Sequence, residues 1–253
     1  MRARGGMVSR GQEGEGGAAR SAGGGASEVA YERLLSQIMR GDYGERLPAE
    51  RELARQLGAS RATVRGALRR LSSLRLVEAR QGSGVVVRPR REWSIEVLPA
   101  YLRFGGSDGR SIGAMLGDLI AIRRALLLSV LGLVAGRVAP GGLSGARAAL
   151  ARAWAARADG AAFTAEDFEM MRAIAESARI LPAMWMLNDV AGIYLEIARA
   201  WAGGLPPLED YVEVHERLFE ALERGDREGA LGTIGAYFER HDARLIGALE
   251  AFT

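Results

Sequence analysis

Three arginines spaced four residues apart form a basic row in the N-terminal third of the chain. They are Arg61, Arg65 and Arg69, within the stretch GASRATVRGALRRL at residues 58–71. Residues four apart lie on one face of an α-helix, so this spacing would align the three guanidinium groups. A guanidinium is a flat fork of N–H donors that matches the acceptors on a guanine edge and the oxygens of a phosphate. The row therefore predicts contact with a polyanion.

A helix-turn-helix is the element that would present this row. The first helix would follow Pro48, carry Glu50 and Glu52 near its positive end, and stop at Gly58. Ser60 can then cap the second helix, because a Ser side chain accepts a hydrogen bond from a free N–H group of the first turn. The spacing i, i+3, i+4, i+7 predicts the buried face of this helix: Val64, Ala67, Leu68 and Leu71. The arginine row falls on the opposite side.

Two extended segments predict a hairpin after the second helix. Residues 76–79 (LVEA) and 85–87 (VVV) flank the glycine-rich tip RQGSG at 80–84. Such a tip after a helix-turn-helix is typical of a wing, which can reach the DNA backbone or minor groove. A further helix is predicted at 28–41, where Val29, Leu34, Leu35 and Ile38 share a face.

The distribution of charge separates two parts of the chain. Residues 28–92 hold 14 Arg against 8 acidic residues, whereas residues 93–253 hold 16 Arg against 21 acidic residues. A basic module followed by an acidic one indicates a nucleic-acid binder joined to a domain that stays off the polyanion. The chain has no Cys, which excludes disulfides, thiolate zinc sites and a Cys nucleophile.

The N-terminal module resembles the winged-helix domain of the GntR family of bacterial transcriptional regulators. The resemblance rests on RLPAERELARQLGASRATVRGALRRL at 46–71 together with LVEARQGSGVVV at 76–87, at the spacing of the family. It implies a set of DNA-contacting residues: Arg51, Ser60, Arg61, Ala62, Thr63, Arg65, Arg69, Gln81 and Gly82. It also implies a homodimer that reads the half-sites of a palindromic operator.

The rest of the chain reads as helix. Segments at 94–104, 111–138, 143–158, 165–180, 182–202, 207–224 and 226–250 are separated by Gly and Pro breaks. We therefore expect a mainly α protein in three parts: a disordered tail at 1–27, a winged helix-turn-helix domain at 28–92, and an all-α seven-helix effector bundle at 93–253. The longest apolar run is too short for a membrane span, so we expect a cytoplasmic protein that does not contact membranes.

The helical segments resemble the effector domain of the FadR subfamily of GntR regulators. HERLFEALERGD at 215–226 matches its H-x-x-L-x-x-A-L-x-x-G-D signature. Many members bind a metal through an Asp and three His, but here Ala165, Glu169 and Tyr237 stand at three of those positions and only His215 remains. The resemblance therefore predicts no metal and no other cofactor. His241, four residues beyond Tyr237, does not fit the spacing and is interpreted as an exposed His.

The expected effector is a fatty acyl-CoA or another carboxylate-bearing metabolite, held by Arg123, Glu169, His215 and Tyr237. Arg123 in LIAIRRALL and Tyr237 at the last His position resemble the fatty-acid-responsive members of the subfamily, which lack the metal and respond to long-chain acyl-CoA. Phe238 would narrow that pocket. The alternative is a sugar acid or organic acid held by a metal on His215 and Glu169.

Two other classes of function fit the sequence less well. An enzyme with a DNA-binding appendage would need catalytic groups, and the chain has two His, no Cys, no H-E-x-x-H motif and no phosphate-binding glycine loop. A sequence-indifferent architectural DNA protein would not need an acidic bundle of this size. We therefore expect a ligand-responsive, sequence-specific DNA-binding regulator that is not an enzyme.

Overall fold

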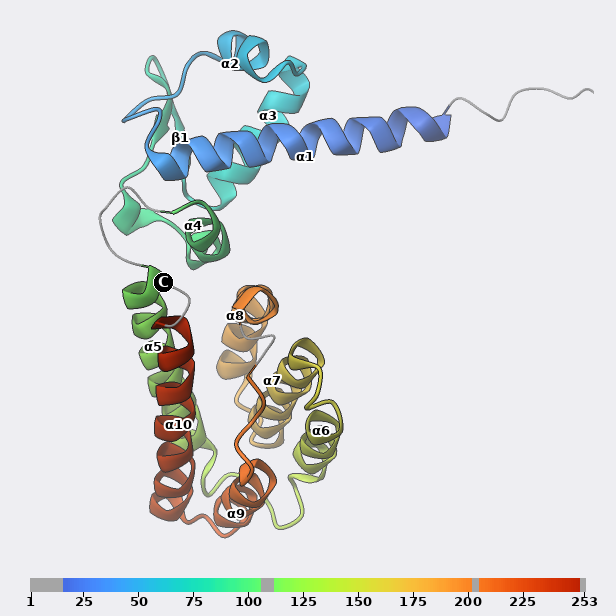
Figure 1. Ribbon diagram of the computed structural model, residues 1–253, viewed down its shortest axis with the longest axis vertical. Helices are drawn as coiled ribbons and strands as arrows, with labels where there is room; N and C mark the ends of the chain where they lie inside the picture. Colours follow the sequence, from blue (N-terminus) through green and yellow to red (C-terminus); the bar gives the residue numbers. More distant parts are fainter. Residues whose placement is uncertain (1–15, 106–111, 202–204, 251–253) are drawn as a thin grey trace, which may run out of the picture. The chain divides into compact units, whose positions relative to one another are not determined.

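The computed structural model describes residues 16–105, 112–201 and 205–250, which form two compact units (Figure 1). The first unit ends at Ser107 and the second begins at Asp108. The fold class predicted from the sequence is confirmed: a winged helix-turn-helix unit is followed by an all-helical one. No helix in these described ranges is long and apolar enough to cross a membrane.

The first unit is built on three helices with the chain order of a helix-turn-helix. Helix α1 spans Gly16–Arg40, α2 spans Glu50–Leu57 and α3 spans Arg61–Ser73. Helix α3 packs against both α1 and α2. The four residues predicted to form its inner face are all buried: Val64, Ala67, Leu68 and Leu71. That contact fixes which side of α3 faces outward.

The turn between α2 and α3 follows from two residues. Gly58 ends α2 in the left-handed conformation, with φ of 61°, and the N–H of Ala59 donates to the carbonyl of Ala54. Ser60 then caps α3, because its Oγ accepts a hydrogen bond of 3.1 Å from the backbone N–H of Thr63.

The wing has one more strand-like segment than the sequence predicted. Strands β1 (Val77–Arg80) and β2 (Gly84–Val87) pair antiparallel, with Val77 opposite Val87. Residues 45–47 add to the other edge of β2 through two backbone hydrogen bonds: Leu47 N–H donates to Val85, and Val87 N–H donates to Glu45. The wing is therefore tied to the segment that leads into α2.

Two expectations about the ends of the first unit differ from the structure. Residues 16–27 belong to α1, so the part of the predicted tail that the structure describes is helical; residues 1–15 lie outside the described residues. Helix α4 (Leu98–Phe104), expected to begin the bundle, packs on α1 instead. Arg103 pairs with Glu32 at 2.7 Å, and Leu102 is buried. The short 3-10 turns η1 (Arg90–Glu92) and η2 (Ile95–Val97) precede α4.

The second unit contains helices α5 to α10 within the described ranges. Their bounds are α5 Ile112–Val134, α6 Ser144–Ala155, α7 Gly160–Ser177, α8 Leu181–Trp201, α9 Tyr211–Glu223 and α10 Arg227–Glu250. Helices α5 and α10 run side by side, and so do α6 and α7 (Figure 1). Six of the seven predicted segments thus form this bundle, and α4 is the exception.

An ion-pair network joins α6 to α9 at one end of the bundle. Arg147 donates to Glu223 through two nitrogens at 2.8 and 3.2 Å and to Glu216 at 3.0 Å. The proximity of Arg147 lowers the pKa of Glu223 through this hydrogen bond. Arg147 contacts two carboxylates and binds Glu223 through two nitrogens. This network therefore joins the two helices and is not a candidate ligand site.

Replacing the capping residue of α3 should weaken the first unit. Ser60→Ala removes the acceptor for the Thr63 N–H, so we expect the free energy of unfolding to fall by about 1 kcal/mol in urea denaturation. Ser72→Ala is the matched control. Ser72 is an exposed residue of α3, and its side chain makes no hydrogen bond within the described residues that the substitution would remove. Equal losses in the two variants would contradict the capping role.

Candidate DNA-binding surface and effector site

The arginine row lies on the exposed side of α3. Arg61, Arg65 and Arg69 are all exposed, opposite the buried face of the helix. In the described parts of the chain, Arg61 and Arg69 have no hydrogen-bond or ion-pair partner, and the same holds for the exposed Arg51 on α2. Arg65 differs, because its Nε donates to Glu50 Oε2 at 2.7 Å.

Arg70 shows that an arginine of α3 is free to bind a polyanion only if it lies on the outward face of the helix. It follows Arg69 directly but turns toward α1, where it binds Glu28 at 2.6 Å and lies 3.6 Å above the ring of Tyr31. Its hydrogen bonds with Glu28 raise the pKa of Arg70. This arginine fastens α3 to α1 and is not available to a polyanion in this arrangement.

The small residues expected to contact DNA lie at the start of α3. Ser60 and Ala62 are exposed and Thr63 is partly exposed. The hydroxyls of Ser60 and Thr63 are 2.9 Å apart. Short side chains here leave the free N–H groups and the positive end of the helix open to a phosphate.

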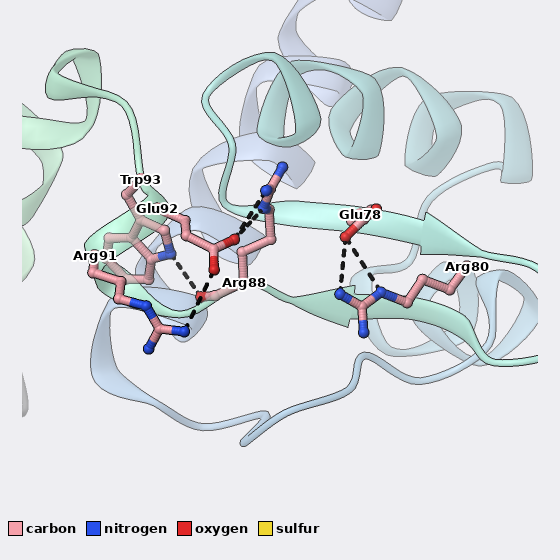
Figure 2. Close-up of polar contacts among 6 residues, drawn as sticks. All are labelled: Glu78, Arg80, Arg88, Arg91, Glu92 and Trp93. Atoms are coloured by element: carbon pink, nitrogen blue, oxygen red, sulfur yellow. Dashed lines mark hydrogen bonds and ion pairs between the residues drawn. The ribbon is translucent and has the colours of Figure 1, made fainter.

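The wing tip presents the two further predicted residues. Gln81 and Gly82 are exposed, and Gly82 has φ of 75°, a conformation that favours glycine. Figure 2 shows the charges behind the tip: Arg80 pairs with Glu78 at 3.1 Å, and Arg88 pairs with Glu92 at 2.9 Å. Trp93 Nε1 donates to the carbonyl of Arg88, which anchors the base of the wing (Figure 2).

The second unit brings eight polar side chains together from five helices. They come from α5, α7, α8, α9 and α10, and we call them the Arg123 cluster: Arg123, Asp167, Tyr194, Tyr211, His215, Tyr237, His241 and Asp242. Three of the four predicted effector residues, Arg123, His215 and Tyr237, are in it. Ligand sites in helical bundles lie between the helices and include a few convergent polar groups, so this cluster is the candidate effector site of the unit.

The charged centre of the cluster is an ion pair between α5 and α10. Arg123 Nη2 donates to Asp242 Oδ1 at 2.7 Å, and the side chain of Asp242 is 5% exposed. Burial raises the pKa of this carboxyl, while the charge of Arg123 acts against the shift. Arg123 Nε, Asp242 Oδ2 and His241 Nδ1 are buried without a hydrogen-bond partner. Arg124 Nε lies within ion-pair distance of that Asp242 oxygen, at 3.7 Å. Buried polar atoms without a hydrogen bond are costly, so these three are candidates for ligand contact.

A second hydrogen-bonded group connects α7 with α9. The Tyr211 hydroxyl donates to Asp167 Oδ1 at 2.7 Å, and His215 Nδ1 lies 2.7 Å from the Tyr211 carbonyl oxygen. Burial raises the pKa of Tyr211 and lowers that of His215. His215 is therefore neutral at pH 7 and donates through Nδ1 to the carbonyl.

His241 belongs to this site, contrary to the expectation of an exposed residue. Its ring stacks on that of Tyr237, with centroids 5.9 Å apart and an interplanar angle of 10°. Burial, helped by the charge of Arg123, lowers the pKa of His241 to about 4. The i, i+4 spacing had indicated the shared helix face; the packing of α10 onto α5 explains the burial.

Glu169 is the one predicted effector residue that the structure does not bring to the cluster. Its side chain is exposed and lies 3.6 Å from Arg172 on the same helix. Two residues earlier, Asp167 faces Tyr211 instead. Residues two apart on a helix point about 200° away from each other. The motif position assigned to Glu169 therefore lies on the far side of α7 from the cluster.

Sequence reasoning missed Asp167, Tyr194, Tyr211 and Asp242. Tyr211 lies four residues before His215, so the helical period alone could have paired them. Asp242 carries no such signal, because its contact with Arg123 joins residues 119 positions apart.

The family models match both units. Residues 26–87 match the model described as "Bacterial regulatory proteins, gntR family", and residues 118–240 match the FCD domain. The "Uncharacterized HTH-type transcriptional regulator Rv0494" of Mycobacterium tuberculosis is 31% identical over 208 residues, which cover 80% of this chain and 81% of that protein. The chain belongs to the GntR family of bacterial regulatory proteins. It is a regulator of this family with an FCD domain, and not an enzyme.

Other relatives match over different lengths. The "Galactonate operon transcriptional repressor" of Escherichia coli K12 is 29% identical, over 78% of this chain and 86% of that protein. The "HTH-type transcriptional regulator Mce2R" of M. tuberculosis is 45% identical over 78 residues. That match spans 30% of this chain and 32% of Mce2R, so the chain spans about a third of this relative's length.

The fold also resembles a solved structure from Listeria monocytogenes, titled "Lar controls the expression of the Listeria monocytogenes agr system and mediates virulence". The TM-score is 0.53 at 16% identity, covering 90% of this chain and 97% of that one. At this identity the likeness concerns the fold alone.

The residues of this GntR regulator do not fit the metal site that many FCD domains carry. Ala165 offers no ligand atom, Glu169 faces away, and His215 is the only His left at the four positions of the motif. Among the described residues, no group of three or more His, Asp or Glu side chains could hold a metal ion. A zinc site needs three or four convergent ligands, so the residues at the four positions of the subfamily motif do not form one.

The low pKa of His241 predicts how stability depends on pH. Between about pH 6.5 and pH 4 the unfolded chain binds a proton that the folded His241 does not, so stability falls as the pH falls. His241→Phe keeps a stacking ring and removes this titration. We expect the loss of unfolding free energy between pH 7 and pH 4.5 to be about 2–3 kcal/mol smaller in the variant. The same loss in both proteins, measured by urea denaturation, would place His241 in solvent.

Proposed function

We propose that the chain is a ligand-responsive, sequence-specific transcriptional regulator. The carrying observation is the exposed arginine row of α3, opposite a fully buried apolar face. In this proposal α3 enters the major groove, Arg61 and Arg65 contact bases, and Arg51 and Arg69 contact phosphates. The wing residues Gln81 and Gly82 reach the flanking backbone or minor groove.

A homodimer on a palindromic operator is part of the proposal. One short recognition helix reads too few base pairs for genomic specificity, and two copies read two half-sites. The second unit offers surface for self-association, because Ile122, Leu126 and Leu133 on α5 are 57%, 46% and 50% exposed. Their spacing places these apolar side chains along one helix face, which suits packing against a second copy.

The proposed effector is a small carboxylate that also carries hydroxyl groups. Arg123 can pair with the carboxylate, while Asp242 Oδ2 and His241 Nδ1 can accept hydrogen bonds from hydroxyl groups. The buried Phe238 ring lies 5.5 Å from the Arg123 guanidinium. A bulky ring beside the proposed carboxylate-binding group favours a small ligand over a long acyl chain. The name of one relative, the galactonate repressor, agrees with this class. Acyl-CoA and metal-held acids are the competing outcomes of the ligand test below.

Arg61→Ala should weaken and broaden DNA recognition. We expect a loss of about 1–3 kcal/mol on the selected operator and a relaxed base preference at one position of each half-site, since a side chain that contacts bases carries sequence information. Fluorescence anisotropy with the operator and with single-base variants of it would measure both effects. Arg217→Ala is the control. It makes the same change in charge on α9, in the second unit, and should leave base preference unchanged. If Arg61→Ala bound the operator as tightly as the unmodified protein, the proposed recognition surface would be wrong.

A ligand screen by thermal shift should identify the effector class. A ligand present at 100 times its Kd stabilises the folded state by about 2.7 kcal/mol, which raises the Tm by roughly 5–10 °C. We expect this rise with hydroxy acids or sugar acids, without added metal and unaffected by EDTA. A rise with long acyl-CoA alone, or stability lost to EDTA, would contradict the proposed class.

Two Arg→Gln variants separate the ligand site from general stability. Arg123→Gln should abolish the ligand-induced rise in Tm, because it removes the group that pairs with the carboxylate. Arg147→Gln is the matched control, since it breaks another interhelical ion pair of the same unit, with Glu223. It should lower the Tm of the free protein and keep the ligand-induced rise.

A further inference from the structure

A carboxylate lies on the proposed recognition surface, where simple electrostatics disfavours it. Glu50 begins α2, and its side chain is 36% exposed. A negative charge close to the DNA backbone repels the phosphates, so Glu50 should by itself weaken binding to every DNA sequence. An increase in affinity for DNA therefore cannot explain why Glu50 lies beside the arginine row.

The contact of Glu50 with Arg65 gives that reason. Arg65 Nε donates to Glu50 Oε2 at 2.7 Å, across the turn of the helix-turn-helix. The other two nitrogens of the guanidinium, Nη1 and Nη2, donate no hydrogen bond within the described residues, and the side chain is 64% exposed. Guanine is recognised by two parallel N–H donors that reach O6 and N7. The Nη1–Nη2 edge is such a pair, and the contact leaves it free.

We propose that Glu50 is a positioning residue for base recognition by Arg65. By holding Nε, the carboxylate restricts an otherwise flexible side chain and presents the Nη1–Nη2 edge to a guanine, which lowers the entropy lost on binding. The inference rests on the proposed function and adds a residue of α2 to the determinants of sequence preference. Glu50 acts on specificity through Arg65 and opposes affinity through its own charge.

The test compares base preference and non-specific affinity in one set of variants. The full chain and each variant select duplexes from a library randomised over the operator length. We expect Glu50→Ala to lose about tenfold in discrimination at one position of each half-site, while its affinity for unrelated DNA stays equal or rises. Arg65→Ala should relax the same position. Adding Glu50→Ala to Arg65→Ala should then cause no further loss of discrimination.

Two further variants separate positioning from charge and from folding. Glu50→Gln keeps an oxygen that can accept from Nε, so it should restore most of the discrimination. Glu52→Ala removes the same charge from the same helix and breaks a comparable pair with Arg55, yet it should leave base preference at that position unchanged. The Tm of each variant shows whether the unit remains folded.

The possible failures are distinct. If the unmodified chain selects no motif, the proposed function fails and the inference fails with it. If a motif depends on Arg65 but persists in Glu50→Ala, only the inference is overturned. It is also overturned if Glu52→Ala relaxes the same position equally, or if Glu50→Ala weakens specific and unrelated DNA alike.

Discussion

The burial of one side of α3 is the contact on which the recognition surface depends. Val64 and Leu71 are fully buried against neighbouring helices, which fixes the rotation of α3 about its axis. This rotation decides that Arg61 and Arg69 face outward while Arg70 turns to Glu28 on α1. The same contact places Arg65 beside Glu50. Hydrophobic packing, and not the number of arginines, thus determines which of them can meet DNA.

A comparable constraint operates in the second unit, with charge in place of apolar packing. Arg123 and Asp242 join α5 to α10 in a nearly buried ion pair that leaves Arg123 Nε and Asp242 Oδ2 without a hydrogen bond, although Arg124 Nε lies 3.7 Å from that oxygen. A buried pair of this kind gains little stability over apolar packing. In the proposed function, a ligand carboxylate would pair with Arg123 in place of Asp242 and would change the contact between these two helices.

Local patterns in the sequence predicted local structure well. The cap at Ser60, the stop at Gly58, the inner face of α3 and the wing all follow from residues within one or two turns of each other. Local patterns could not predict contacts between residues that are far apart in the sequence. The sequence did not indicate that α4 packs on α1, that Glu169 faces solvent, or that Asp242 meets Arg123. Each depends on which helix faces become neighbours, a property of the whole unit.

The stoichiometry and symmetry of the protein–DNA complex decide whether two copies of the chain read the two half-sites of one operator. Light scattering on the chain bound to its selected operator, combined with hydroxyl-radical footprinting of the same complex, gives both quantities. We expect two chains per duplex and two protected segments related by a two-fold axis. One chain per duplex with a single asymmetric footprint would contradict this expectation.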